Sequence, residues 1–168
     1  PFKLDIIKTP SSSMPSSAKS CANYANSFLA KKKAINEGYD EAILLNQAGF
    51  ISEGPGENIF IIKHGQLFTP TLADDILKGI TRDTVITIAN DMGIETIEKQ
   101  LTIEDLLTSD ECFFTGTAAE VTPIREINNQ TIGNGGKGHL TSTIQSAYFN
   151  IVKGKDNNYA SWLTMCND

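Results

Sequence analysis

Four short strand-like runs follow one another between residues 41 and 69, and they constrain the fold more than any other feature of the chain. They are Glu41–Leu45, residues 49–52, Asn58–Lys63 and Gln66–Thr69. Only His64 and Gly65 separate the last two runs, and such a two-residue connection is typical of a β-hairpin. This region therefore predicts a sheet built from hairpins rather than from a repeated strand–helix–strand unit.

Helical patterns lie on both sides of these strands. Apolar residues fall near helical spacing in residues 19–38, 81–92 and 140–153. Thr102 and Asp105 form a capping-box pattern that predicts a short helix ending at Leu107. Further strands are expected over residues 3–8, 94–100, 112–115 and 121–127. The mixture of strands and helices predicts the α+β class, in one domain that covers residues 1–168.

Composition excludes several classes of protein. The chain has 14 Lys and Arg against 20 Asp and Glu, a net charge of −6, which disfavours sequence-independent binding to nucleic acid. Its longest apolar runs, residues 42–45 and 59–62, are far shorter than the roughly 18 residues of a membrane helix. The three cysteines (Cys21, Cys112, Cys166) are widely spaced without a C-x-x-C pair, which argues against a disulfide framework or a zinc site. We therefore expect no nucleic acid, membrane or metal partner, and a reducing, cytoplasmic location.

The start of the sequence suggests that more chain precedes it. Pro1 and Phe2 lead directly into an alternating, strand-like run, with no initiator Met and no signal peptide. We expect the 168 residues to be a fragment of a longer protein, although removal of a Met would give the same start.

Lys19 is the first candidate for chemistry, because it lies between a Ser- and Pro-rich loop and an Ala-rich helical run. A lysine held there against apolar neighbours loses its proton more readily, and the free amine can form a Schiff base. From position alone, an ordinary surface lysine in the first helical turn is the simpler interpretation.

Residues 53–58 (EGPGEN) form a second candidate, a stiff turn between two strands that carries Glu53 and Glu57. One carboxylate is suited to pairing with a cationic ring nitrogen or an amine. The spacing fits no calcium loop, and a plain hairpin connection is the simpler interpretation.

Two further segments are suited to anions. Gly79 opens a helix whose free N–H groups, with the Thr81 hydroxyl, make a natural phosphate site, although the sequence is not a nucleotide P-loop. Residues 115–120 (TGTAAE) are small enough for backbone N–H groups to approach an anion, or for a simple β-bulge. His64 and His139 are too isolated to suggest a catalytic triad or a histidine metal site.

Taken in order, these segments resemble the class IV (fold type IV) pyridoxal-phosphate aminotransferases, and among them most closely the branched-chain amino acid aminotransferases. The segments that carry the resemblance are residues 18–24 (AKSCANY), 51–60 (ISEGPGENIF), 67–70 (LFTP), 79–82 (GITR) and 116–123 (GTAAEVTP). The match spans about residues 17–151. It implies the large, C-terminal, cofactor-bearing domain of the fold that D-amino acid aminotransferase also adopts, without the N-terminal small domain.

The resemblance implies a role for each matching residue. Lys19 is the Schiff-base lysine, which then moves the proton between the substrate Cα and the cofactor. Glu53 pairs with the pyridine nitrogen of pyridoxal 5'-phosphate, and Tyr24 hydrogen-bonds its ring oxygen. The phosphate contacts are implied at Ile80, Thr81 and Thr117, and the contacts to the substrate carboxylate at Thr117 and Ala118.

The implied reaction moves the amino group of Leu, Ile or Val to 2-oxoglutarate, giving a branched 2-oxo acid and glutamate, in a homodimeric enzyme of branched-chain amino acid biosynthesis. Pro55 departs from the small residue that is usual in the class signature. The family's small domain supplies an Arg for the phosphate and aromatic residues for the substrate, so these 168 residues alone are expected to turn over little.

Three alternatives stay open from the sequence. A D-amino acid aminotransferase or an aminodeoxychorismate lyase would use the same lysine and glutamate, although residues 56–58 and 116–123 favour the branched-chain enzymes. A truncated, non-catalytic domain would keep the motifs without activity. Sugar-phosphate or nucleotide binding at residues 79–81 would be indifferent to Lys19→Ala.

Overall fold

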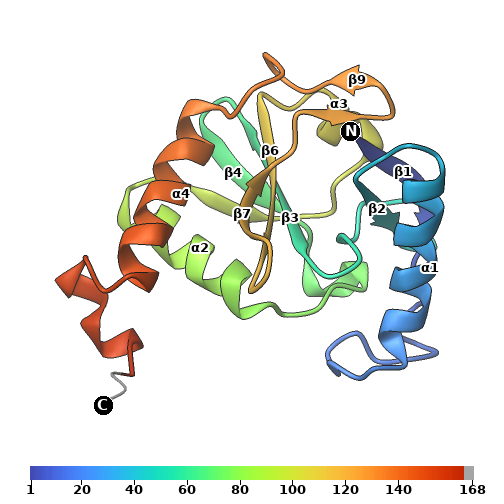
Figure 1. Cartoon of the computed structure of the whole chain (residues 1–168), viewed down its shortest axis with the longest axis horizontal. Coiled ribbons are helices and arrows are strands. Elements are labelled where there is room, and N and C mark those ends of the chain that lie inside the picture. The colour runs from blue at the N-terminus through green and yellow to red at the C-terminus, as the bar shows by residue number, and fades with distance from the viewer. Residues whose placement is uncertain (165–168) are drawn as a thin grey trace.

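The computed structural model describes residues 1–164, with the backbone but not the side chain of Asp5. Cys166, counted among the cysteines above, lies outside the described residues. The described chain forms two sheets, with helix α1 on one side and helices α2 and α4 on the other (Figure 1).

The first sheet has the strand order β2-β1-β8-β9. Its strands are β1 (Phe2–Ile7), β2 (Glu41–Leu45), β8 (Glu126–Ile127) and β9 (Gln130–Thr131). Strands β1 and β2 are parallel and are joined through α1 (Asn23–Asn36), so the chain does contain one strand–helix–strand unit. Ala30 and Ala34 of α1 pack against Ala42 and Leu44 of β2, and their small side chains allow close approach.

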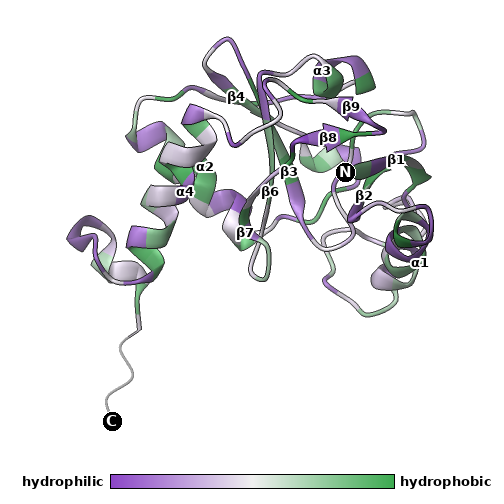
Figure 2. Ribbon diagram, turned by 45° about the horizontal axis from the view of Figure 1, so that its top comes forward, coloured by the Kyte–Doolittle hydropathy of each residue, from purple (hydrophilic) through white to green (hydrophobic). Residues whose placement is uncertain are grey.

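The second sheet has the order β5-β4-β3-β6-β7. Its strands are β3 (Asn58–Lys63), β4 (Gln66–Thr69), β5 (Thr96–Glu98), β6 (Glu111–Gly116) and β7 (Glu120–Pro123). His64 and Gly65 connect β3 to β4 with φ of 52° and 78°, which confirms the two-residue hairpin. Strand β3 pairs with β6 as well, so it is central and buried, and it is drawn mainly in green in Figure 2.

Side chains alternate between two cores along β3 and β6. Ile59 and Ile61 face a core that also holds Phe2 of β1, which joins the two sheets. Phe60 and Ile62 face α2 (Ile80–Asp91) and α4 (His139–Val152). Because both faces of the second sheet are covered, its central strands read as continuous apolar runs rather than as alternating ones.

Several predicted boundaries are confirmed and others are wrong. The runs predicted for β2, β3 and β4 match to the residue, and α3 (Ile103–Leu107) has the predicted capping box. Residues 49–52 form no strand, only an isolated bridge between Ile51 and Leu45. Residues 121–127 divide into two strands that belong to different sheets. The sequence did not predict β9 or the 3-10 helices Leu72–Asp74 and Asn157–Trp162.

Helix α1 begins at Asn23, four residues after the predicted start at Lys19. Residues 18–22 stay outside the helix, and the Asn23 side chain stabilises this segment by donating to the carbonyls of Pro15 (3.0 Å) and Ala18 (2.8 Å). The larger apolar residues of this helix, Phe28, Leu29 and Ile35, are exposed. Among the described residues, none of the helices has the length and apolar character needed to cross a membrane.

Truncation of Phe60 tests the core between the second sheet and its helices. Phe60 is fully buried and stacks on Phe113, with ring centroids 5.2 Å apart and planes 8° apart. We expect Phe60→Ala to lower the free energy of unfolding of the chain by about 3–5 kcal/mol, through lost burial and the cavity left behind. Urea denaturation measures it. Leu29→Ala is the matched control, because Leu29 is 64% exposed, and a change of about 0.5 kcal/mol or less is expected there. Equal losses in both variants would contradict this assignment of the core.

Candidate functional site

One cleft gathers most of the residues that the sequence singled out. It opens where the loop before α1, the turn after Glu53, the start of α2 and the end of β6 meet. Lys19, Tyr24, Glu53, Ile80, Thr81 and Thr117 all line it. Ala118 does not line the cleft, although it follows Thr117 directly and is exposed.

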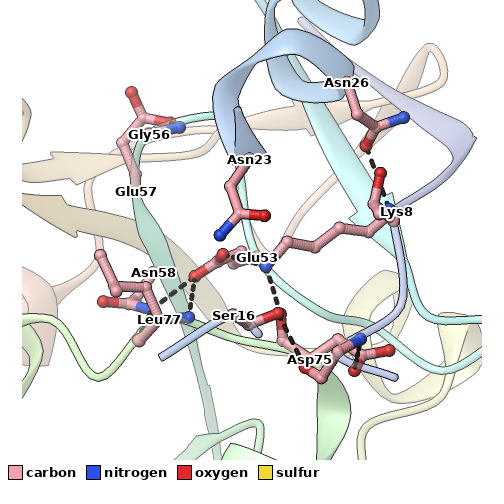
Figure 3. A network of polar contacts seen from close by, with 12 residues as sticks. Lys8, Ser16, Asn23, Asn26, Glu53, Gly56, Glu57, Asn58, Asp75 and Leu77 are labelled. Atoms are coloured by element: carbon pink, nitrogen blue, oxygen red, sulfur yellow. Dashed lines mark hydrogen bonds and ion pairs between the residues drawn. The ribbon is translucent and has the colours of Figure 1, made fainter. Parts of the chain in front are cut away.

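Glu53 lines the cleft and is buried, with only 8% of its surface exposed. Its Oε2 accepts hydrogen bonds from Asn58 Nδ2 (2.9 Å) and from the Leu77 amide (3.0 Å). Its Oε1 accepts from Lys8 Nζ, and Figure 3 shows the carboxylate held between these groups. Burial raises the pKa of Glu53, whereas the Lys8 charge and the Leu77 amide act to lower it.

Asn58 links this carboxylate to the start of α2. Its Nδ2 also donates to the Leu77 carbonyl (2.8 Å), two residues before the N-cap of the helix, Gly79. A Cβ on Gly79 would lie 2.1 Å from Asn58 Oδ1, so any other residue at this position would have to displace the Asn58 side chain. The packing therefore fixes the helix start relative to Glu53.

The first turn of α2 presents the features of an anion site. The N-cap residue, Gly79, has no side chain with which to cap the helix, so the N–H groups of the first turn are suited to an outside acceptor such as a ligand anion. Thr81 is buried, whereas Ile80, whose amide belongs to this turn, has its side chain 75% exposed. A negatively charged group at the mouth of the cleft would therefore meet oriented N–H dipoles.

The end of β6 forms the remaining wall. Thr115 lines the cleft, is 1% exposed, and its hydroxyl has no hydrogen-bond partner among the described residues. Gly116 approaches the Gly56 carbonyl so closely that an added Cβ would lie 3.3 Å from that oxygen. An unpaired hydroxyl at the wall of a cleft is suited to a ligand that offers it a hydrogen bond.

Lys19 lies in the segment before α1 and is exposed, which agrees with the surface-lysine interpretation of its position rather than with apolar surroundings. The helix starts later than predicted, and Ala18 and Lys19 of the preceding segment line the cleft. The Lys19 amine nevertheless shares the cleft with Glu53 and with the start of α2.

Sequence reasoning missed Lys8, and it assigned no role to Asn58 or Thr115, although both lie in the candidate segments 53–58 and 115–120. Lys8 follows β1 directly and is buried, and its Nζ donates both to Glu53 and to the carbonyl of Asp75. The only signal for Lys8 was a cation at the end of an apolar strand. For Asn58 it was a polar residue at the start of one.

The donor set fits pyridoxal phosphate. An amine, a buried carboxylate and a free helix start suit its aldehyde, its ring nitrogen and its phosphate respectively. Within residues 1–164, no group of three or more His, Cys, Asp or Glu side chains is placed to hold a metal ion.

Comparison with known proteins leads to the same family as the sequence motifs. The family model described as amino-transferase class IV matches residues 5–127. A probable branched-chain-amino-acid aminotransferase of Aquifex aeolicus is 52% identical over 153 residues, which cover 90% of this chain and 49% of that protein.

Solved structures agree closely in fold. The T.th. branched-chain amino acid aminotransferase complexed with N-(5'-phosphopyridoxyl)-L-glutamate has a TM-score of 0.96 and 40% identity, covering 99% of this chain and 56% of that one. The branched-chain aminotransferase of Thermoproteus uzoniensis, with norvaline, has a TM-score of 0.93 and 48% identity, covering 97% of this chain and 54% of that one. The chain thus spans about half the length of the relatives that it matches.

The close contact between Gly79 and Asn58 gives a test of how the site is built. We expect Gly79→Ala to lower the free energy of unfolding by about 1–3 kcal/mol, because the added Cβ displaces the Asn58 side chain. Thermal unfolding measures the effect. Gly56→Ala is the matched control in the same cleft, since a Cβ there has no atom within 4 Å. A neutral Gly79→Ala would show that the helix start is not fixed by Asn58.

Proposed function

The chain belongs to class IV of the aminotransferases, and from that membership we propose that the protein transfers amino groups from Leu, Ile and Val to 2-oxoglutarate with pyridoxal phosphate as cofactor. One observation carries the proposal: Lys19, the buried Glu53 and the start of α2 converge on a single cleft. In this proposal residues 1–168 form the large, cofactor-binding domain.

Bound pyridoxal phosphate supplies an aldehyde carbon for the amine and a cationic ring that stabilises negative charge at the substrate Cα. Lys19 Nζ would hold the cofactor through its aldehyde carbon, and the same amine, when free, would serve as the base that takes and returns the proton at the substrate Cα. Glu53 accepts a hydrogen bond from the ring N–H and stabilises its positive charge. Tyr24 donates its phenolic proton to the ring oxygen.

The opposite end of the cleft binds the anionic groups. The N–H groups of Ile80 and Thr81 and the Thr117 hydroxyl bind the phosphate. Thr117 and the exposed Ala118 offer backbone N–H groups to the substrate carboxylate at the mouth of the cleft. In this proposal the ring nitrogen would lie against the buried Glu53, and the substrate carboxylate would lie beside the exposed Ala118.

The choice of substrates rests on the relatives. The matched proteins are named for branched-chain amino acids, which supports Leu, Ile and Val over D-amino acids. The T.th. enzyme is complexed with a phosphopyridoxyl derivative of L-glutamate, which supports glutamate and 2-oxoglutarate as the second pair. We further propose that the protein is a homodimer, is located in the cytoplasm and acts in the biosynthesis of branched-chain amino acids.

Reductive trapping tests the cofactor chemistry. We expect borohydride treatment of the purified protein with pyridoxal phosphate to leave one stable adduct, on Lys19, identified by peptide mapping. Lys8 serves as the control lysine within the same protein, because it lines the same cleft but forms an ion pair with Glu53. Lys19→Ala is expected to abolish the adduct, and Lys32→Ala, on the exposed side of α1, to leave it unchanged. An adduct on Lys8, or labelling spread over surface lysines, would contradict the proposal.

The unpaired hydroxyl of Thr115 gives a test of ligand contact without turnover. Thr115→Val keeps the shape and removes a buried hydroxyl that lacks a partner, so we expect the melting temperature of the cofactor-free protein to stay equal or rise. The affinity for pyridoxal phosphate should fall several-fold, by about 0.5–1.5 kcal/mol for one lost hydrogen bond. Fluorescence titration measures it. Thr141→Val is the matched control, because the Thr141 hydroxyl is also buried without a partner but does not line the cleft. Equal affinities in the two variants would show that Thr115 makes no ligand contact.

A further inference from the structure

We propose that Lys8 is a positioning residue that keeps Glu53 ionised and oriented toward the ring nitrogen of the cofactor. The inference rests on the proposed function, since it assigns a role to a residue behind the cofactor carboxylate. The observation that carries it is the ion pair between Lys8 and Glu53 at the wall of the cleft, in which both side chains are about nine-tenths buried.

The geometry holds both partners of the pair in place. Lys8 Nζ donates to Glu53 Oε1 and to the Asp75 carbonyl, as Figure 3 shows. The backbone N–H of Lys8 donates to the Leu45 carbonyl (2.7 Å), and the Glu53 carbonyl accepts from the Leu44 amide (2.8 Å). Strand β2 therefore anchors the backbones of both residues, and the ion pair does not depend on a mobile surface side chain.

The position of Asp75 is itself constrained. Asp75 has a left-handed φ of 61°, and its Oδ1 accepts from the Ser11 amide (2.8 Å). That turn directs the Asp75 carbonyl at Lys8, so the ammonium is satisfied on the side away from Glu53. Such a backbone conformation is uncommon for residues other than glycine.

Counting hydrogen bonds at Glu53 shows that room for a ligand remains. An ionised carboxylate offers about four acceptor positions. Asn58, Leu77 and Lys8 occupy three of them in this structure. One position is left, which matches the single N–H of a protonated pyridine ring, so Lys8 and the ring need not compete.

The charges around Glu53 show why a cation is needed. Burial raises the pKa of this carboxyl, and the nearby Glu57 raises it further, whereas Lys8 is the cation that opposes them. Without Lys8 the carboxyl would hold its proton more tightly, and a protonated carboxyl cannot stabilise a cationic ring. Lys8 thus acts through Glu53 on the ring nitrogen, without touching the reacting atoms.

The experiment compares two ligands that differ only at the ring nitrogen: pyridoxal phosphate and its analogue with carbon in place of that nitrogen. Equilibrium affinities are measured for wild type, Lys8→Met, Lys8→Arg and a control, Lys99→Met. Lys99 is the matched control because it is also paired with a carboxylate, Asp105, but does not line the cleft. We expect Lys8→Met to lower the ratio of the two affinities, natural cofactor over carbon analogue, by about tenfold. Lys8→Arg should restore most of the ratio, and Lys99→Met should not change it.

Several results would overturn the role of Lys8. An unchanged ratio in Lys8→Met, with both affinities falling together, would show a purely structural ion pair. A higher ratio would show that Lys8 competes with the ring for Glu53. If Lys8→Met does not fold, Lys8→Gln keeps a hydrogen-bond donor without the charge and must show the same fall in the ratio.

The outcome separates this inference from the proposed function. If wild type binds pyridoxal phosphate and forms the Lys19 adduct while the ratio is insensitive to Lys8, only the role of Lys8 fails. If wild type binds neither ligand and forms no adduct, the proposed function fails, and the inference with it.

Discussion

The burial of one carboxylate, Glu53, sets the conditions that the rest of the site satisfies. A charged group that leaves water must be compensated by hydrogen bonds and an opposite charge, because its uncompensated cost is several kcal/mol. The compensation comes from residues far apart in the chain: Lys8 after β1, Asn58 at the start of β3, and the Leu77 amide before α2. The cleft lies where these elements meet. The hydrogen bonds and the ion pair that compensate the buried Glu53 therefore also hold the ends of these elements in place.

The start of α2 is held by the same hydrogen bonds. The side-chain amide of Asn58 donates both to Glu53 and to the Leu77 carbonyl, which brings the helix start against β3 and leaves no space for a side chain at Gly79. An anion held by the first turn of the helix therefore stands at a fixed distance from the carboxylate. A ligand that carries a cationic nitrogen at one end and a phosphate at the other meets a site whose two ends are set by one asparagine.

The sequence predicted the local features well because their causes are local. The hairpin at His64 and Gly65 and the capping box of α3 depend on residues a few positions apart. Lys8 was missed because its partner lies 45 residues away, and nothing in a strand-end lysine reveals which carboxylate it meets. The predicted start of α1 was wrong because hydrogen bonds from the Asn23 side chain stabilise the preceding segment in a non-helical conformation. The family resemblance supplied Lys19 and Glu53, which periodicity alone left open.

Strand β1 connects the stability of the fold to the chemistry of the cleft. Near its start, Phe2 packs edge-on against Phe114 of β6, with ring centroids 5.4 Å apart, and joins the core between the two sheets. Just beyond its other end, Lys8 reaches Glu53. Thr115, next to Phe114 along β6, contributes its unpaired hydroxyl to the same cleft. Because β2 anchors the backbones of both Lys8 and Glu53, a shift of one sheet against the other would move this ion pair relative to Thr115 of β6. The packing of Phe2 on Phe114 therefore helps to hold the two walls of the cleft in register.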